Sequence, residues 1–209
     1  MKFKTLYTLA LSSVILFSCG DPATEQTEET TETEVVLKKS YYTVNADNSI
    51  INWRGEVAGV YGHIGNVNLQ SGTFTFSDEN LTGGEFVVDM LSIMPTDDGT
   101  FKDQDGGRLE DLKGHLTTED FFATETYPTS KFVITNVDGN TVTGDLTIRD
   151  KTSEESFEIS SLEKTEGGVT LSGSITFDRQ KYDVAWVHYM QDMILSDDIV
   201  LNITVEATK

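Results

Sequence analysis

The chain has 209 residues, enough for one domain of ordinary size with a full hydrophobic core and a tail. It carries 15 Lys and Arg against 35 Asp and Glu, so the formal net charge is −20 and a surface for binding nucleic acid is not expected. The single cysteine excludes an intramolecular disulfide. Beyond the N-terminal segment, no apolar run is long enough to cross a bilayer as a helix.

The first segment, residues 1–18, has the features of a lipoprotein signal peptide. Lys2 and Lys4 give a short positive start, residues 6–17 are mostly apolar, and Leu16-Phe17-Ser18-Cys19-Gly20 resembles the bacterial lipobox. The resemblance implies diacylglycerol on the Cys19 thiol, cleavage before Cys19, and acylation of the new amine by a palmitate-type chain. Two or more acyl chains make a stable membrane anchor. The alternative is an ordinary secretory signal that ends by chance in a cysteine.

Residues 19–40 are predicted to be an acidic flexible tether. Residues 20–34 contain six carboxylates, many threonines and no basic residue, namely Asp21, Glu25, Glu28, Glu29, Glu32 and Glu34. Such a stretch cannot bury enough apolar area to fold. Acidic residues after a lipid-bearing cysteine also act as an export signal in some Gram-negative lipoproteins. The expected location is therefore the cell envelope, lipid-anchored to a membrane, with the outer membrane favoured and the periplasmic or surface side left open.

Residues 41–209 are predicted to be the folded domain, because alternation with a period of two dominates from residue 41 onward. Residues 169–177 and 199–207 place apolar side chains on one face and polar side chains on the other. Asp138-Gly139-Asn140 lies between two alternating runs and predicts a hairpin. The alternation slips around Gly72, which predicts a bulge. About eight such runs, joined mostly by short turns, predict an all-β up-and-down antiparallel barrel.

The segment 96–128 interrupts this pattern. Residues 108–112 are predicted to form a short helix, and residues 117–120 are predicted to cap a second helical turn through Phe121 and Phe122. Tyr127-Pro128 is expected to end that turn. A long insert between strands is often a lid or a plug.

Several short motifs in the insert and the strands occur in a recognisable order. Residues 115–122 read His-Leu-Thr-Thr-Glu-Asp-Phe-Phe, and Tyr127-Pro128 and Lys131-Phe132 follow. With the runs at 83–93, 142–148, 177–179 and 198–201, they resemble the YceI-like family of bacterial polyisoprenoid-binding proteins over roughly residues 41–209. The resemblance implies an extended lipocalin-like antiparallel β-barrel of about eight strands, a short helical insert, and a lengthwise apolar cavity for a long isoprenoid or similar amphiphile. It implies no established reaction.

The apolar faces and the insert supply the candidate ligand-binding residues. These are Phe74, Phe76, Phe86, Val88, Met90, Phe121, Phe122, Phe132, Ile134, Leu146, Ile148 and Phe177. Most inward residues of any barrel are ordinary core, and only a subset is expected to contact a ligand. Phe121 and Phe122 are expected either to plug a cavity end or simply to anchor the insert. Because each buried methylene contributes ~0.8 kcal/mol, an isoprenoid tail needs no charged contact to bind.

No cofactor, metal or catalytic constellation is predicted. The three histidines, His63, His115 and His188, lack the spacing of a zinc site. His63 is interpreted as a loop histidine, with a place beside a ligand head group as the alternative. His115 is expected to hydrogen-bond to backbone and so to hold the insert.

Two charged motifs receive structural interpretations. Asp178-Arg179 is predicted to be an ion pair or a turn device, with head-group binding by Arg179 as the alternative. The acidic residues Asp97, Asp98, Asp103 and Asp105 are interpreted as a solvated loop, because they lack the closing Glu of a calcium loop.

The leading hypothesis is a non-enzymatic, membrane-tethered carrier or reservoir for an isoprenoid-like lipid of the quinone or polyprenyl type. The negative charge makes a neutral head group easier to accept than a pyrophosphate. The first alternative is an envelope interaction or stress-response protein with a packed barrel and no ligand. A less favoured one is a lipid-modifying enzyme that uses His63, His115 or the acidic loop. A homodimer is left open.

Overall fold

The computed structural model describes residues 37–57, 61–97, 109–186 and 195–209. The signal peptide, Cys19 and the acidic residues of the tether lie outside the described residues, as do Asp98, Asp103, Asp105 and His188. The elements in chain order are β1 (Lys39–Val44), η1 (Ala46–Asn48), β2 (Ile50–Val57), β3 (Tyr61–Ser77), β4 (Asn80–Pro95), α1 (Leu109–Thr117), β5 (Thr129–Asp138), β6 (Thr141–Ile148), β7 (Lys151–Lys164), β8 (Gly168–Asp178), η2 (Arg179–Tyr182) and β9 (Leu195–Thr208).

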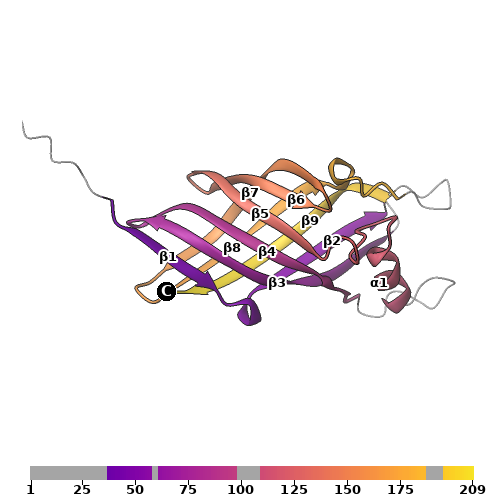
Figure 1. The fold of residues 1–209 in the computed structure, drawn as a ribbon, viewed down its shortest axis with the longest axis horizontal. Helices are drawn as coiled ribbons and strands as arrows, with labels where there is room; N and C mark the ends of the chain where they lie inside the picture. The colour runs from indigo at the N-terminus through magenta and orange to yellow at the C-terminus, as the bar shows by residue number, and fades with distance from the viewer. Residues whose placement is uncertain (1–36, 58–60, 98–108, 187–194) are drawn as a thin grey trace, which may run out of the picture. The chain divides into compact units, whose positions relative to one another are not determined.

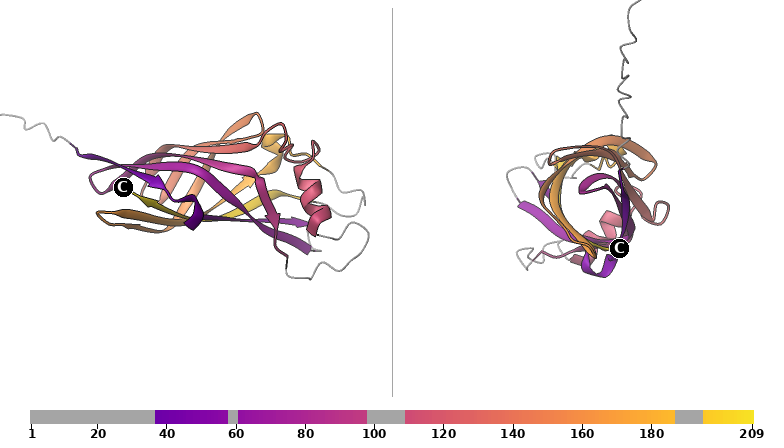
Figure 2. Two further views of the ribbon diagram at one scale, coloured as in Figure 1. Left: turned by 60° about the horizontal axis from the view of Figure 1, so that its bottom comes forward. Right: turned by 90° about the vertical axis from the view of Figure 1, so that its left-hand side faces the viewer.

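The strands form one closed antiparallel sheet (Figure 1). Strands β2 to β9 pair with their neighbours in chain order, and β9 pairs back with β2 through Trp53↔Leu201 and adjacent residues. Seen end-on in Figure 2, the strands follow one another around a ring. The predicted all-β, lipocalin-like barrel is thus confirmed. Closure satisfies the backbone groups that an open sheet would leave at its two edges.

Strand β1 is a ninth strand, and it lies between β3 and β9 beyond the start of β2. It pairs with the second half of β3, with Tyr42 opposite Phe74, whereas β2 pairs with the first half. Its last residue, Val44, also reaches Ala207 at the end of β9. The single turn η1 separates the two strands. Together β1 and β2 fill the space between β3 and β9 over the length of the barrel.

Local irregularities keep the apolar face inward. The hairpin predicted at residues 138–140 joins β5 to β6, and Gly139 adopts the left-handed conformation with φ 58°. The register of β3 against β4 shifts between Leu69 and Ser71, beside Gly72, as the slipped alternation predicts. Because one extra residue reverses which side chains point inward, Leu69 and Phe74 both face the interior.

One end of the barrel is packed solid, and we call it the packed end. Phe76 is completely buried there, and the Tyr42 ring meets it edge-on at 5.6 Å between centroids. The Tyr42 hydroxyl donates to the carbonyl of Thr165 at 3.2 Å. Lys164 Nζ lies over the Phe76 ring and donates to the Glu79 carboxylate at 2.8 Å. These contacts fasten the β3–β4 hairpin to the end of β7.

The insert lies at the opposite end, which carries α1 (Figure 1). Helix α1 covers Leu109–Thr117 and so extends well beyond the predicted residues 108–112. A hydrogen-bonded turn does follow through Phe121 and Phe122, with the Phe121 N–H donating to the Thr118 carbonyl at 3.0 Å, but the predicted capping role of residues 117–120 is wrong. The hydroxyls of Thr117 and Thr118 donate backward, to the carbonyls of Gly114 and His115 at 2.8 and 2.7 Å. Turns then lead the chain to buried Phe121 and Phe122.

Arg179 is a structural clamp at the α1 end. It is 2 % exposed, and its guanidinium donates to the carbonyls of Val184 and Ser196 and to the carboxylate of Asp197. Its ion-pair partner is therefore Asp197, whereas Asp178 accepts a hydrogen bond from the backbone N–H of Gln180 at the start of η2. The clamp joins the segment after η2 to the beginning of β9.

We expect Arg179→Ala to lower the free energy of unfolding by about 3 kcal/mol, because several buried carbonyls lose their donor at once. Urea unfolding followed by circular dichroism measures the change. Lys151→Ala is the control, since Lys151 pairs with Asp183 at the surface and its removal should leave the midpoint unchanged. Equal midpoints for the two variants would contradict the clamp.

Candidate ligand-binding cavity

The barrel encloses a cavity of about 810 Å³. All eight strands from β2 to β9 contribute to its lining, and most of the lining side chains are apolar. Representative residues, one from each strand in chain order, are Trp53, Leu69, Val88, Phe132, Leu146, Phe157, Leu171 and Ile203. A volume of this size lies within the range of about 300–1,000 Å³ that is usual for ligand pockets.

The interior is hollow because several inward side chains meet empty space rather than one another. Phe86, Val88, Phe132 and Ile134 belong to the inward stripes of β4 and β5, yet they are only partly buried. The same holds for Leu201 and Ile203 of β9. All six line the cavity. A barrel with a solid core would have buried these side chains completely.

The predicted ligand-binding residues fall in the lining with one exception. Phe74, Phe86, Val88, Met90, Phe121, Phe122, Phe132, Ile134, Leu146, Ile148 and Phe177 all line the cavity. Phe76 does not, because it lies in the packed end beneath Lys164.

The structure also adds lining residues that the prediction lacked. They include residues from two strands that the prediction did not use, β2 and β9, which contribute Ile51, Trp53, Ile199, Leu201, Ile203 and Val205. The alternation in residues 199–207 was a signal that could have identified the β9 residues. Trp186, which follows η2, carries no such signal.

Two glycines hold aromatic rings against the barrel wall. A Cβ at Gly144 would lie 2.5 Å from the ring of Phe132 and 2.5 Å from the carbonyl of Val133. A Cβ at Gly173 would likewise meet the Phe157 ring at 2.6 Å. Each ring therefore covers a glycine on the neighbouring strand instead of projecting toward the barrel axis. This arrangement leaves room inside a barrel whose lining is rich in phenylalanine.

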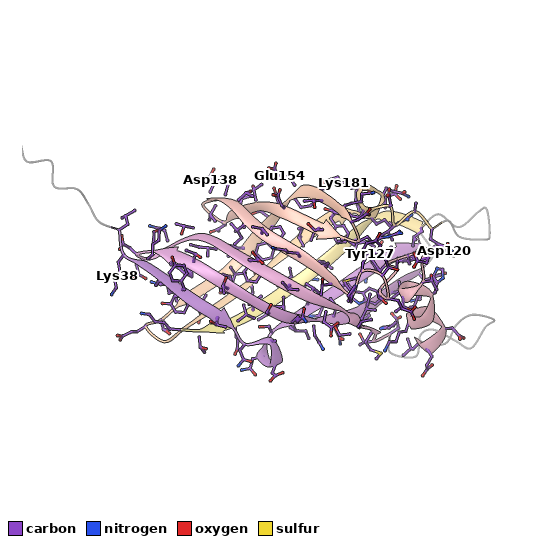
Figure 3. The ribbon with its side chains drawn as sticks, in the orientation of Figure 1. Lys38, Asp120, Tyr127, Asp138, Glu154 and Lys181 are labelled. Carbon is purple, nitrogen blue, oxygen red and sulfur yellow. The ribbon has the colours of Figure 1, made fainter. Side chains whose placement is uncertain are left out.

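Polar lining residues gather at the α1 end of the cavity. They are Glu56, Tyr61, His63, Asp111, His115, Ser130 and Lys131. The lining toward the packed end is apolar and includes Phe74, Val142, Leu171 and Val205. Figure 3 shows the two ends through labelled residues, with Lys38 at the packed end and Asp120 and Tyr127 at the α1 end. The cavity can thus accommodate an amphiphile in one orientation, with its polar group near α1.

His63 and Asp97 form a buried pair in this polar region. His63 Nδ1 lies 2.9 Å from Asp97 Oδ2, and Asp97 Oδ1 accepts from the backbone N–H of Ile64 at 2.9 Å. Asp97 is only 8 % exposed. The interpretations of His63 as a loop residue and Asp97 as part of a solvated loop are therefore wrong, because strand β3 carries His63 and its pairing buries the carboxylate.

His115 lies on α1 between two aromatic rings of the insert region. Its ring centroid is 4.6 Å from that of Trp186 and 5.4 Å from that of Phe121, both edge-to-face. Burial lowers the pKa of His115, and the nearby Asp120 carboxylate opposes this only in part. Within the described residues, its buried Nε2 atom has no hydrogen-bond partner. The expected hydrogen bond from this ring to backbone is thus absent from the described residues, and packing holds the ring in place.

The described residues include no cluster of three or more His, Cys, Asp and Glu side chains that could hold a metal ion. In the same ranges no helix is both long and apolar enough to cross a membrane.

Comparison with known proteins identifies relatives of this chain. A sequence model of the YceI-like domain matches residues 42–207. The UPF0312 protein of Staphylococcus epidermidis strain RP62A is 33% identical over 124 residues, which span 56% of this chain and 71% of that protein.

Two solved structures resemble the barrel. BcnA of Burkholderia cenocepacia aligns with a TM-score of 0.60 and 19% sequence identity, over 79% of this chain and 99% of its own. A polyisoprenoid binding domain from Saccharophagus degradans, implicated in plant cell wall breakdown, aligns with a TM-score of 0.53 and 11% identity, over 82% and 99% of the two chains. At these identities the similarity demonstrates a common fold.

We expect Gly144→Ala to push the Phe132 ring into the cavity and to lower the binding of an apolar fluorescent probe severalfold. The overpacked wall should also lose about 1–3 kcal/mol of stability. Titration with N-phenyl-1-naphthylamine measures the first effect and urea unfolding the second. Gly83→Ala is the matched control, since a Cβ there would meet only Thr75, at an ordinary 3.7 Å. Unchanged probe binding in Gly144→Ala would show that the ring does not hold the cavity open.

Proposed function

Since this chain belongs to the YceI-like domain family, we propose that its barrel binds a long apolar lipid of the isoprenoid type and carries or stores it in the cell envelope. The observation that carries the proposal is the hollow interior, about 810 Å³ in volume and lined by partly buried apolar side chains. The fold shared with a polyisoprenoid binding domain supports the same ligand class. A quinone or a polyprenyl compound fits this description.

The binding energy for such a ligand comes from its tail. Each methylene that leaves water contributes ~0.8 kcal/mol, and the cavity walls offer apolar contact on all sides. The lining residues of β9 extend from Leu195 to Val205, roughly 30 Å of strand at ~3.3 Å per residue. A slender chain can therefore bury many methylenes along the barrel without a charged contact.

The two alternatives have less support. An interaction protein with a packed barrel is disfavoured by the cavity itself, although the outer surface remains available for partners. A lipid-modifying enzyme needs a nucleophile or an acid–base group with an oriented partner at the reacting atom. Of the polar lining residues, His63 has an oriented partner in Asp97, but this pair alone does not make a catalytic site. Binding without catalysis is the simpler proposal.

Filling the cavity should abolish lipid binding. The double variant Leu201→Phe/Ile203→Phe adds two rings to the lumen and should lower the lipid recovered per barrel about tenfold or more, because many methylene contacts are lost. Native purification followed by lipid extraction and mass spectrometry measures this. Asn202→Phe is the matched control, since Asn202 lies between the two residues and is exposed on the outer face. If every preparation of the wild-type protein were free of lipid, the carrier function would be wrong.

We further propose that acyl chains on Cys19 anchor the protein to a membrane. Lys38, the last described residue before β1, lies at the packed end (Figure 3), so the proposed tether joins the barrel opposite its polar end. This arrangement leaves α1 and the polar lining on the side away from the point of attachment.

Cys19→Ser should release the protein from the membrane fraction, because no thiol remains to receive diacylglycerol. Fractionation with and without detergent and mass spectrometry of the N-terminal peptide test this. Ser18→Ala serves as the control, since a small residue before the cysteine is retained. Persistent detergent-dependent membrane association of Cys19→Ser would contradict a lipid anchor on this residue.

A further inference from the structure

The strongest unexplained feature of the cavity is the buried Nε2 atom of His115. Among the described residues it has no hydrogen-bond partner, although His115 belongs to the cavity lining. A buried polar atom left unpaired is destabilising, because it has lost the hydrogen bonds that water would make to it. Native proteins leave few such atoms, so each one calls for a physical reason.

The surroundings of His115 offer little to satisfy this atom. The nearest ring systems, Trp186 and Phe121, meet it edge-to-face, and an aromatic face is only a weak hydrogen-bond acceptor. Leu112 and Leu116 of the same helix also line the cavity and are apolar. Within the described residues no group gives Nε2 a strong hydrogen bond, and a polar group that enters the cavity can supply one.

Resting on the proposed function, we propose that His115 is the hydrogen-bonding subsite for the head group of the bound lipid, and that this head group is an uncharged oxygen, a hydroxyl or a carbonyl. A neutral imidazole serves either group, since Nε2 accepts from a hydroxyl in one tautomer and donates to a carbonyl in the other. The apolar tail then extends toward the packed end, where the lining carries no polar group among the residues described.

The charges around the cavity favour a neutral head group over a phosphate. The lowered pKa of His115 leaves its ring uncharged at neutral pH. Glu56 and Asp111 contribute carboxylates to the lining, of which Glu56 is paired with Arg54 at 2.6 Å. The Asp97 carboxylate lies 2.9 Å from His63 Nδ1. Lys131 also belongs to the lining, and its ammonium group is paired with the Glu85 carboxylate at 2.8 Å.

No arginine occurs in the described lining. Within the described lining a phosphate would therefore find no guanidinium, and the one lysine there, Lys131, is already paired with a carboxylate.

The test compares three lipids that share one unsaturated tail: geranylgeraniol, its diphosphate ester, and the tetraene hydrocarbon in which a hydrogen replaces the hydroxyl. Wild-type protein should bind the alcohol about five- to tenfold more tightly than the hydrocarbon, as one net hydrogen bond predicts. It should bind the diphosphate more weakly than the alcohol. Binding is measured by competition against N-phenyl-1-naphthylamine. A menaquinone with an equal tail tests the carbonyl.

His115→Phe keeps a ring between Trp186 and Phe121 but removes Nε2. It should lower affinity for the alcohol about five- to tenfold and leave affinity for the hydrocarbon unchanged. His115→Gln, whose amide reaches a position similar to Nε2, should restore part of the preference. An equal loss for both lipids would show that His115 only packs, and tighter binding of the diphosphate would overturn the neutral class.

A second measurement needs no variant. In ¹⁵N-histidine-labelled wild-type protein, the Nε2 resonance of His115 should shift on addition of the alcohol and stay unchanged with the hydrocarbon. If both lipids bind and neither changes the chemical shift of Nε2, the subsite is refuted and the carrier function is unaffected. Failure of every lipid to bind the wild-type protein would refute the carrier function itself.

Discussion

The pairing of β2 with β9 is the constraint on which the rest of the structure depends. It joins residues about 150 positions apart in the chain, such as Trp53 and Leu201, and converts a meander of hairpins into a closed barrel. Once the sheet is closed, every second residue must point into a shared interior. The apolar faces of the amphipathic strands therefore line this interior. Whether the interior is solid or hollow depends on how far the side chains fill it.

Side-chain placement answers that question differently at the two ends. At the packed end, Tyr42 and Phe76 fill the lumen and Lys164 fastens the hairpin above them. Along the middle, glycines such as Gly144 take up aromatic rings from the neighbouring strand, so bulky residues line the wall without closing the space. At the α1 end, polar groups enter the lining. The cavity is therefore asymmetric, apolar toward the packed end and polar toward α1, and an amphiphile has one favourable orientation in it.

Much of the fold was accessible from the sequence because alternation is a local signal. The stripes at residues 169–177 and 199–207, the turn at Gly139 and the slip beside Gly72 all correspond to features of the strands. The cavity was predicted from the family resemblance of residues 115–122, because periodicity alone does not show whether a barrel is hollow. Phe74 and Phe76 share one stripe, yet only Phe74 lines the cavity. Phe76 packs instead beneath Lys164 at the end of β7, a contact between residues far apart in the chain that the local pattern cannot show. The buried state of Asp97 and the unpaired Nε2 of His115 depend on tertiary packing in the same way.

Strand β1 gives the domain a mechanical property. Its backbone hydrogen bonds to β3, from Lys39 to Thr43, run across the strand direction. A pull on the preceding chain along the strand axis loads all of these bonds together in shear, rather than opening them one after another like a zipper. Tension from the N-terminal side is thus borne by the wall at the packed end. The polar part of the cavity lining lies at the α1 end of the same sheet, away from the strand that carries this load.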